Sequence, residues 1–143
     1  MATAGPVGHM PKAPGTWGTL AGLPVYWLIS LLSPGQTVAA LLGVIGLAVI
    51  TSHLAEKSSG EKDPGKIVID EIAGMAVTVA GISFSWVNFL LGFGVFRILD
   101  IFKPFPIRWI ERRTSGGFGI VLDDVAAGII GNGVVRLLIF VTG

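Results

Sequence analysis

The sequence predicts an all-α fold, a compact, membrane-embedded bundle of about five short apolar helices with its charged loops at one end. Of the 143 residues, 52% are hydrophobic and only 13% are charged, and the mean hydropathy is +0.77. The charges are also clustered, since none of the four charged residue types occurs between Lys12 and Glu56 or between Glu71 and Arg97. Uncharged tracts of this length are typical of membrane helices. The length indicates a single domain over residues 1–143.

Composition excludes several other classes of protein. The formal net charge is only +1, and no basic run is interleaved with aromatic residues, so nucleic acid is not an expected partner. The chain has no cysteine, which excludes disulfides, thiolate metal sites and thiol nucleophiles. Nothing in the sequence specifies an oligomeric state.

Glycine, proline and polar residues mark where the predicted helices end. Ser33-Pro34-Gly35 and residues 81–86 read as turns, and Lys103-Pro104 ends a helix because proline cannot continue it. Residues 11–19, 56–66 and 104–119 read as polar loops. The helices are therefore expected at about residues 17–32, 37–55, 67–80, 87–102 and 122–141. Strand is the alternative for 66–69 and 133–141, but a bilayer disfavours unpaired strand edges.

This order of helices and turns brings nearly every charge to one end of the bundle. If the two turns lie at the far end, then the near end holds the 56–66 loop, the 104–124 segment, and Thr16, Asp70, Glu71, Arg97, Asp100 and Lys103. Arg136 is the exception, and its long side chain can reach the opposite interface. Helices of roughly 14 to 19 residues would be about 21 to 28 Å long, slightly less than a ~30 Å hydrocarbon core. A thin membrane bundle is therefore expected, and a soluble bundle remains the alternative.

Five of the nine acids are placed at the polar ends of predicted apolar helices: Asp70, Glu71, Asp100, Asp123 and Asp124. Carboxylates gathered at the ends of apolar helices repel one another unless they share a divalent cation. All-oxygen ligation favours a hard ion, with Mg²⁺ first and Mn²⁺ as a substitute. The alternative is local pairing, in which Asp100 bridges Arg97 or Lys103 and Asp123 caps a helix.

Cationic side chains and glycines beside these acids predict a phosphate site. Arg97, Asp100 and Lys103 share one helix face, which suits an anionic headgroup with the carboxylate on metal and the bases on phosphate. A structural ladder of ion pairs is the alternative. Further candidates for phosphate binding are Thr16 in the first loop, Arg108 in the loop after Lys103, and Gly117 in the glycine-rich stretch 116–119, which is expected to precede the last helix.

Four blocks of sequence together resemble the phosphatidylglycerophosphatase A family: PGTWGT (14–19), KDPGKIVIDEIAG (62–74), FRILDIFKPFPIRWIE (96–111) and GGFGIVLDDVAAGI (116–129). The resemblance implies a Mg²⁺-dependent phosphatase of the bacterial inner membrane. Such an enzyme removes the terminal phosphate of phosphatidylglycerophosphate and leaves phosphatidylglycerol. It also implies that the five acids are the catalytic and metal-binding residues, with Arg97 and Lys103 as phosphate partners.

The expected chemistry is metal-assisted hydrolysis, in which the metal polarises the phosphoryl group and activates water. Direct attack by water and an aspartyl-phosphate on Asp100 or Asp123 both remain open. A small membrane transporter or cation-binding protein could use the same carboxylates, but would place them at mid-helix. A phosphatidyltransferase is disfavoured because Asp70 is followed by Glu71 rather than glycine. The excess of basic residues at the charged end predicts that this end faces the cytoplasm, in a multi-pass arrangement.

Overall fold

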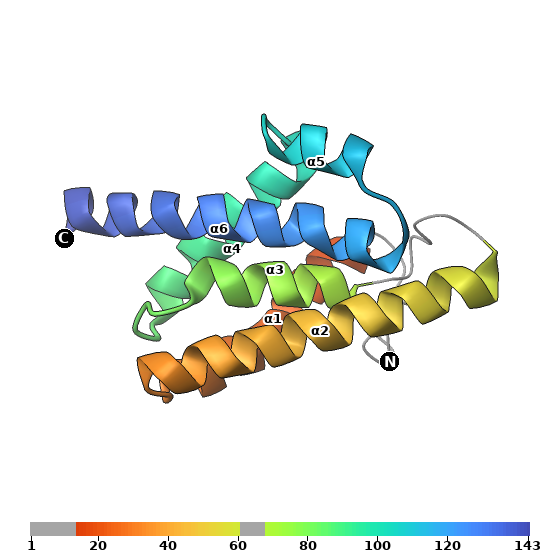
Figure 1. Ribbon diagram of the computed structural model, residues 1–143. Helices are drawn as coiled ribbons and strands as arrows, with labels where there is room; N and C mark the ends of the chain where they lie inside the picture. Colours follow the sequence, from red (N-terminus) through yellow and green to blue (C-terminus); the bar gives the residue numbers. More distant parts are fainter. Residues whose placement is uncertain (1–13, 61–67) are drawn as a thin grey trace.

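The computed structural model describes residues 14–60 and 68–143, and within these ranges every regular element is an α-helix. The helices are α1 (Pro14–Ser30), α2 (Pro34–Ser59), α3 (Ile69–Val79), α4 (Trp86–Phe102), α5 (Ile107–Arg113) and α6 (Gly116–Thr142). Figure 1 shows α3 between α2 and α6, with the short α5 at one end of the bundle. The prediction of an all-α bundle is confirmed, and the strand alternative for residues 133–141 is wrong.

The described residues form one helix more than the five that the sequence places, because residues 107–113 of the predicted polar loop form α5. The last helix also begins at Gly116 rather than Leu122. As a result, the glycine-rich stretch forms the first turn of α6 and does not precede it. The predicted loop at 61–66 and the predicted helix start at Ile67 lie outside the described residues.

Helix α2 is longer than predicted at both ends. It begins at Pro34, where proline is tolerated because the first turn has no N–H partner. Ser33 and Gln36 cap it reciprocally, since Gln36 N–H donates to Ser33 Oγ and Ser33 N–H donates to Gln36 Oε1 (3.0 Å). Gly60, with φ of 70°, closes the other end in the left-handed conformation. The polar residues 56–59 therefore continue the helix instead of opening the loop.

Helix α3 is the centre of the bundle, since it packs against α1, α2, α4 and α6. Its buried Met75 and Val79 join a core cluster with Tyr26, Phe89 and Phe96 from α1 and α4. Burying large side chains of this kind contributes roughly 1.5 to 3 kcal/mol each. The central place of α3 also fixes where its first turn, with Asp70 and Glu71, meets the neighbouring helices.

The turns lie where the sequence predicts them, around residues 31–33 and 80–85. Helices α1, α3 and α6 therefore begin at one end of the bundle, and α2 and α4 finish there. We call this end, which includes α5, the charged end; the C-terminus lies at the opposite, far end (Figure 1). The prediction that Asp70, Glu71, Arg97, Asp100 and Lys103 gather at one end is confirmed.

Two helices are long and apolar enough to cross a membrane, Pro34–Ser58 within α2 and Gly116–Thr142. Their most apolar windows are only 17% and 22% buried within the protein. The core helix of a soluble protein would be mostly buried, so this exposure indicates membrane association. At 25 and 27 residues these helices are about 38 and 40 Å long, and the expected length of 14 to 19 residues is wrong for both.

Candidate metal and phosphate site

Two glycines bring the acidic residues of α3 and α6 together. A Cβ on Gly128 would lie 2.5 Å from the carbonyl oxygen of Gly74, and a Cβ on Gly74 would lie 2.8 Å from that of Asp124. Only glycine allows the two backbones to approach this closely. Both helices start at the charged end, so they run parallel, and the residues one turn before these glycines are Asp70 and Asp124. The close approach therefore places these two carboxylates side by side.

Asp70, Glu71 and Asp124 form an acidic cluster in which one carboxylate oxygen from each lies within 4.8 Å of the others. Asp70 and Asp124 are only 7% and 4% exposed. Burial raises the pKa of Asp70 well above its usual value, and the adjacent Glu71 raises that pKa further. Burial likewise raises the pKa of Glu71. The apolar surroundings and mutual repulsion thus disfavour the charged forms of these acids in the absence of a cation.

Asp100 and Asp123 lie within electrostatic range of Asp124, but each is paired with a base. Arg97 Nη1 donates to Asp100 Oδ2 at 2.5 Å, so the local pairing considered for Asp100 is present. Lys103 Nζ donates to Asp123 Oδ2 at 2.5 Å. Burial alone would lower the pKa of Lys103, but its ion pairs raise that pKa overall. Lys103 therefore remains a cation beside the acidic cluster.

Several polar atoms at the site are buried without a hydrogen-bond partner among the described residues. They are Asp70 Oδ1, Glu71 Oε2, Asp123 Oδ1 and Arg97 Nε, together with Ser52 Oγ on α2. An unpaired buried polar atom costs roughly 1 to 3 kcal/mol, and more when it is charged. Three of the five are carboxylate oxygens, which are hard ligands. Two of these oxygens, on Asp70 and Glu71, belong to the acidic cluster, and its donor set, completed by Asp124, fits a divalent cation such as Mg²⁺.

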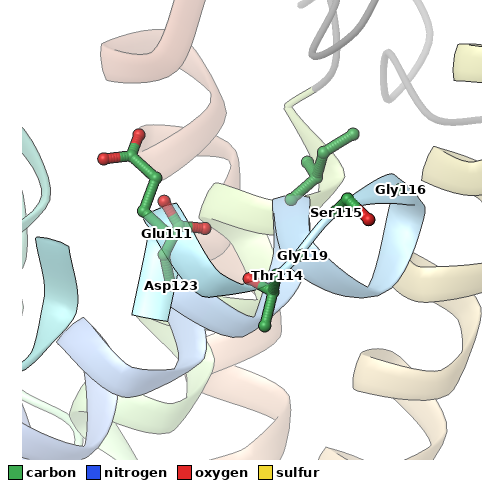
Figure 2. A pocket seen from close by; sticks show the side chains of 7 residues that line it. Glu111, Thr114, Ser115, Gly116, Gly119 and Asp123 are labelled. Carbon is green, nitrogen blue, oxygen red and sulfur yellow. The ribbon is translucent and has the colours of Figure 1, made fainter. Parts of the chain in front are cut away.

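A pocket of about 270 Å³ opens next to Asp123, between α5 and the start of α6. Figure 2 shows Glu111 and Asp123 close together in this pocket, with Thr114 and Ser115 also lining it. Lys103 Nζ also donates to Glu111 Oε1 at 2.9 Å, so one ammonium group joins the two acids. Glu111 is not among the site residues that the sequence predicts. Glu111 follows Lys103 by eight residues, and this spacing does not predict contact between them unless α5 is recognised as a helix.

The remaining predicted phosphate ligands have varied surroundings. Thr16 lies in the first turn of α1, at the charged end and partly buried. Arg108 Nη2 donates to the carbonyl oxygen of Phe102 at 3.1 Å, which satisfies an acceptor at the end of α4. Gly117 is buried, and a Cβ there would lie 2.3 Å from the backbone nitrogen of His53. The packing of α6 on α2 accounts for glycine at 117, and a role in binding phosphate remains a prediction.

Asp123 and Asp124 differ from expectation in their position along the helix. Because α6 begins six residues before Leu122, they lie two turns inside it, whereas Asp70 and Glu71 occupy the first turn of α3. Asp100 lies in the last turn of α4. The acids thus come from the ends of two helices and from the body of a third, and position along the helix does not by itself separate a phosphatase from a cation-binding protein.

Comparisons with known proteins identify the family of this chain. The family described as Phosphatidylglycerophosphatase A matches residues 1–139. The chain is 40% identical over 134 residues to a phosphatidylglycerophosphatase A of Escherichia coli, covering 92% of this chain and 77% of that protein. It is 39% identical over 133 residues to a phosphatidylglycerophosphatase A of Haemophilus influenzae, covering 85% and 76%.

A third relative, from Bacteroides thetaiotaomicron, is provisionally named a phosphatidylinositol-3-phosphatase. It is 33% identical over 129 residues, covering 85% of this chain and 80% of that protein. No solved structure matches the chain. The match over residues 1–139 and the two relatives near 40% identity show that the chain belongs to the phosphatidylglycerophosphatase A family and is a phosphatase, a phosphoric monoester hydrolase.

Proposed function

We propose that this chain hydrolyses the terminal phosphate monoester of phosphatidylglycerophosphate and so supplies phosphatidylglycerol in phospholipid synthesis. The family and the names of two relatives support this substrate. One structural observation carries the proposal. The acidic cluster, with its unpaired oxygens, lies beside the cationic Lys103 at one end of an apolar bundle. A lipid with an anionic headgroup would meet that end at the membrane surface.

The acidic cluster of Asp70, Glu71 and Asp124 would hold Mg²⁺. Its oxygens are near enough to share one ion, and their burial removes the water that would otherwise solvate them. A bound Mg²⁺ would neutralise charge on the phosphoryl group and activate a water molecule. Asp100 lies within electrostatic range of the cluster, so it adds negative potential and keeps Arg97 directed towards the site.

Lys103 and Asp123 would act directly on the phosphate. Lys103 Nζ binds Asp123 Oδ2, which leaves Asp123 Oδ1 without a hydrogen bond from any described residue. That oxygen can accept a proton from the attacking water or attack the phosphorus itself. In either route the bond between phosphorus and the glycerol oxygen breaks and phosphatidylglycerol leaves; in the second route, water then hydrolyses the aspartyl-phosphate. Lys103 and Arg97 would stabilise the negative charge that the phosphoryl oxygens carry during transfer.

The membrane arrangement follows from the two long apolar helices. Helices α2 and α6 would cross the bacterial inner membrane, with the remaining helices packed against them, as a multi-pass protein. The charged end carries Arg108, Arg112 and Arg113 on α5, and a basic end is retained in the cytoplasm. The acidic cluster would then face the cytoplasmic surface.

A cation-binding or transport protein is the second candidate, because Asp123 and Asp124 lie inside a helix that could cross the membrane. Phosphatidylinositol 3-phosphate is the competing lipid substrate, since one relative carries that name. Both relatives near 40% identity favour phosphatidylglycerophosphate instead.

The test is release of inorganic phosphate by the purified chain in non-ionic detergent. Phosphatidylglycerophosphate, phosphatidylinositol 3-phosphate and glycerol phosphate would be compared, each with Mg²⁺ and with excess chelator. We expect Mg²⁺-dependent release that is fastest from phosphatidylglycerophosphate. If a folded sample released no phosphate from any substrate, the proposal would be overturned in favour of cation binding. Faster release from phosphatidylinositol 3-phosphate would overturn the assignment of phosphatidylglycerophosphate as the substrate.

A further inference from the structure

A second hollow, of about 380 Å³, is lined by Lys103 and shares no lining residue with the pocket at Asp123. Lys103 lines this hollow, while its ammonium group pairs with Asp123 and Glu111, which line the first pocket. The ion pairs of Lys103 therefore link the linings of the two spaces. A ligand that occupied both would have to carry groups suited to each.

The two spaces differ in charge because of the spacing along α5. Arg108 and Arg112 are four residues apart, so they share a helix face, and both line the second hollow. Glu111 lines the first pocket instead. None of the described carboxylates forms an ion pair with Arg108 or Arg112. The second hollow thus has two arginine side chains, both exposed, that can bind an anion.

The rim of the second hollow is aromatic. Phe105 is 82% exposed, Phe102 68% and Trp109 51%, and all three line the hollow. Exposed aromatic rings next to arginine side chains are typical of the zone where lipid headgroups meet acyl chains. The anion that fits this hollow is therefore attached to a lipid, which selects the phosphodiester of a phospholipid over free phosphate.

We propose that the second hollow binds the diester phosphate of the substrate phospholipid, with Arg112 and Arg108 as its ligands, while the terminal monoester lies at Asp123 and the acidic cluster. This inference rests on the proposed function, because that substrate carries one phosphate of each kind joined by a glycerol. The glycerol would pass beside Lys103, which lines the second hollow and pairs with Asp123 in the first. Phe102, Phe105 and Trp109 would contact the diacylglycerol part. Arg112 thereby becomes a residue that selects lipid over soluble monoesters.

The test compares Arg112→Gln with Arg113→Gln in the full chain, in non-ionic detergent micelles at fixed surface concentration of lipid. Arg113 is the matched control because it is on the same helix and equally cationic, but lies over the Trp109 ring, 5.3 Å from its centre, and does not line the hollow. Arg108 is less suitable for substitution, since it also binds the end of α4. Both substitutions are on exposed side chains, so both proteins should fold.

Two inhibitors separate the two spaces. Phosphatidylglycerol has the diester but no monoester, and inorganic phosphate resembles the monoester alone. We expect Arg112→Gln to raise the KM for phosphatidylglycerophosphate and the Ki for phosphatidylglycerol about tenfold, as for loss of one charge-assisted hydrogen bond. Its kcat and its Ki for inorganic phosphate should stay within about twofold, because binding away from the reacting atoms affects ground and transition states equally.

Equal effects of Arg112→Gln and Arg113→Gln would overturn the inference, and so would a rise in the Ki for inorganic phosphate as large as that for phosphatidylglycerol. Either result with an active wild-type chain would leave the proposed function intact. A wild-type chain that releases no phosphate from phosphatidylglycerophosphate would overturn the proposed function itself. The two failures are therefore distinguishable.

Discussion

The two ends of this bundle differ in whether their polar groups find partners within the protein. At the far end, Asn132 Nδ2 donates to the carbonyl oxygens of Val77, Thr78 and Ala80, which end α3. Arg136 donates to Asn132 Oδ1 at 2.8 Å and to the carbonyl oxygen of Ala80 at 3.0 Å. At the charged end, three carboxylate oxygens and Arg97 Nε are buried without a partner among the described residues.

This difference separates polar groups that stabilise the fold from polar groups that are open to a ligand. The last carbonyl groups of a buried helix end need hydrogen-bond donors. Asn132 and Arg136 provide these donors to the end of α3 from within the protein. The sequence predicts only that the long side chain of Arg136 reaches the far interface, and it gives no sign of this capping role. The unpaired carboxylate oxygens of Asp70, Glu71 and Asp123 have no such partner among the described residues, which is why we propose that a cation and a phosphate bind there. Substitutions at the charged end should therefore lower the catalytic rate, and substitutions at the far end should lower the free energy of unfolding.

The largest expected effect is on catalysis, from Asp70→Asn. The substitution keeps the shape of the side chain and removes one ligand charge from the acidic cluster. We expect kcat for phosphate release to fall by at least about 100-fold, as when an electrostatic group is removed from a transition-state site. The melting temperature without metal should not fall, because a neutral amide relieves repulsion from Glu71. An unchanged kcat would remove Asp70 from the site.

A smaller effect is expected from Lys103→Ala. Loss of the ammonium group removes the proposed phosphate partner and leaves Asp123 and Glu111 without their shared cation. We expect kcat/KM to fall roughly 10- to 100-fold, largely through a higher KM. Thr37→Ala is the control, since Thr37 is buried at the far end, near Ile82 and Ser83 in a separate pocket. Similar kinetics for the two variants would argue against phosphate contact by Lys103.

The smallest effect on catalysis is expected from Asn132→Ala, which sharpens the comparison from the far end. The substitution removes donors from three carbonyl groups and an acceptor from Arg136, so the free energy of unfolding should fall by about 1 to 3 kcal/mol. Thermal unfolding in detergent would show a lower midpoint. The kcat of the folded protein should stay within about twofold of wild type. A large loss of kcat would mean that the two ends are not independent.

Much of the bundle could be predicted because hydrophobic tracts and proline-containing turns are local signals. The turn at Ser33 and the turn near residues 81–85 set the direction of four helices, which is enough to gather Asp70, Glu71 and Asp100 at one end. Helix α5 was missed because seven residues rich in arginine, after two prolines, have the composition of a loop. Its stability comes from the buried Ile107 and from packing on α6, which the sequence does not display.

The loop predicted at residues 116–119 is wrong because of the glycines there, which form the first turn of α6. Three glycines in four residues lower helix propensity, which argues for a loop at 116–119. Gly117 is nevertheless part of the helix. Glycine is needed there because a larger residue would collide with the backbone of His53. The same tertiary requirement at Gly74 and Gly128 decides which acids meet. Asp70, Glu71 and Asp124 form the cluster while Asp100 and Asp123 face bases, and that division depends on helix contacts that no spacing rule gives.

Equilibrium binding of Mg²⁺, measured by titration calorimetry on the detergent-solubilised wild-type, Asp70→Asn and Asn132→Ala chains, tests the central contrast most directly. If the unpaired carboxylates of the charged end await a cation, then wild type and Asn132→Ala should bind Mg²⁺ with similar affinity, and Asp70→Asn should bind it at least about tenfold more weakly. Binding of Mg²⁺ to Asp70→Asn as tightly as to wild type, or no binding to the folded wild-type chain, would contradict the account.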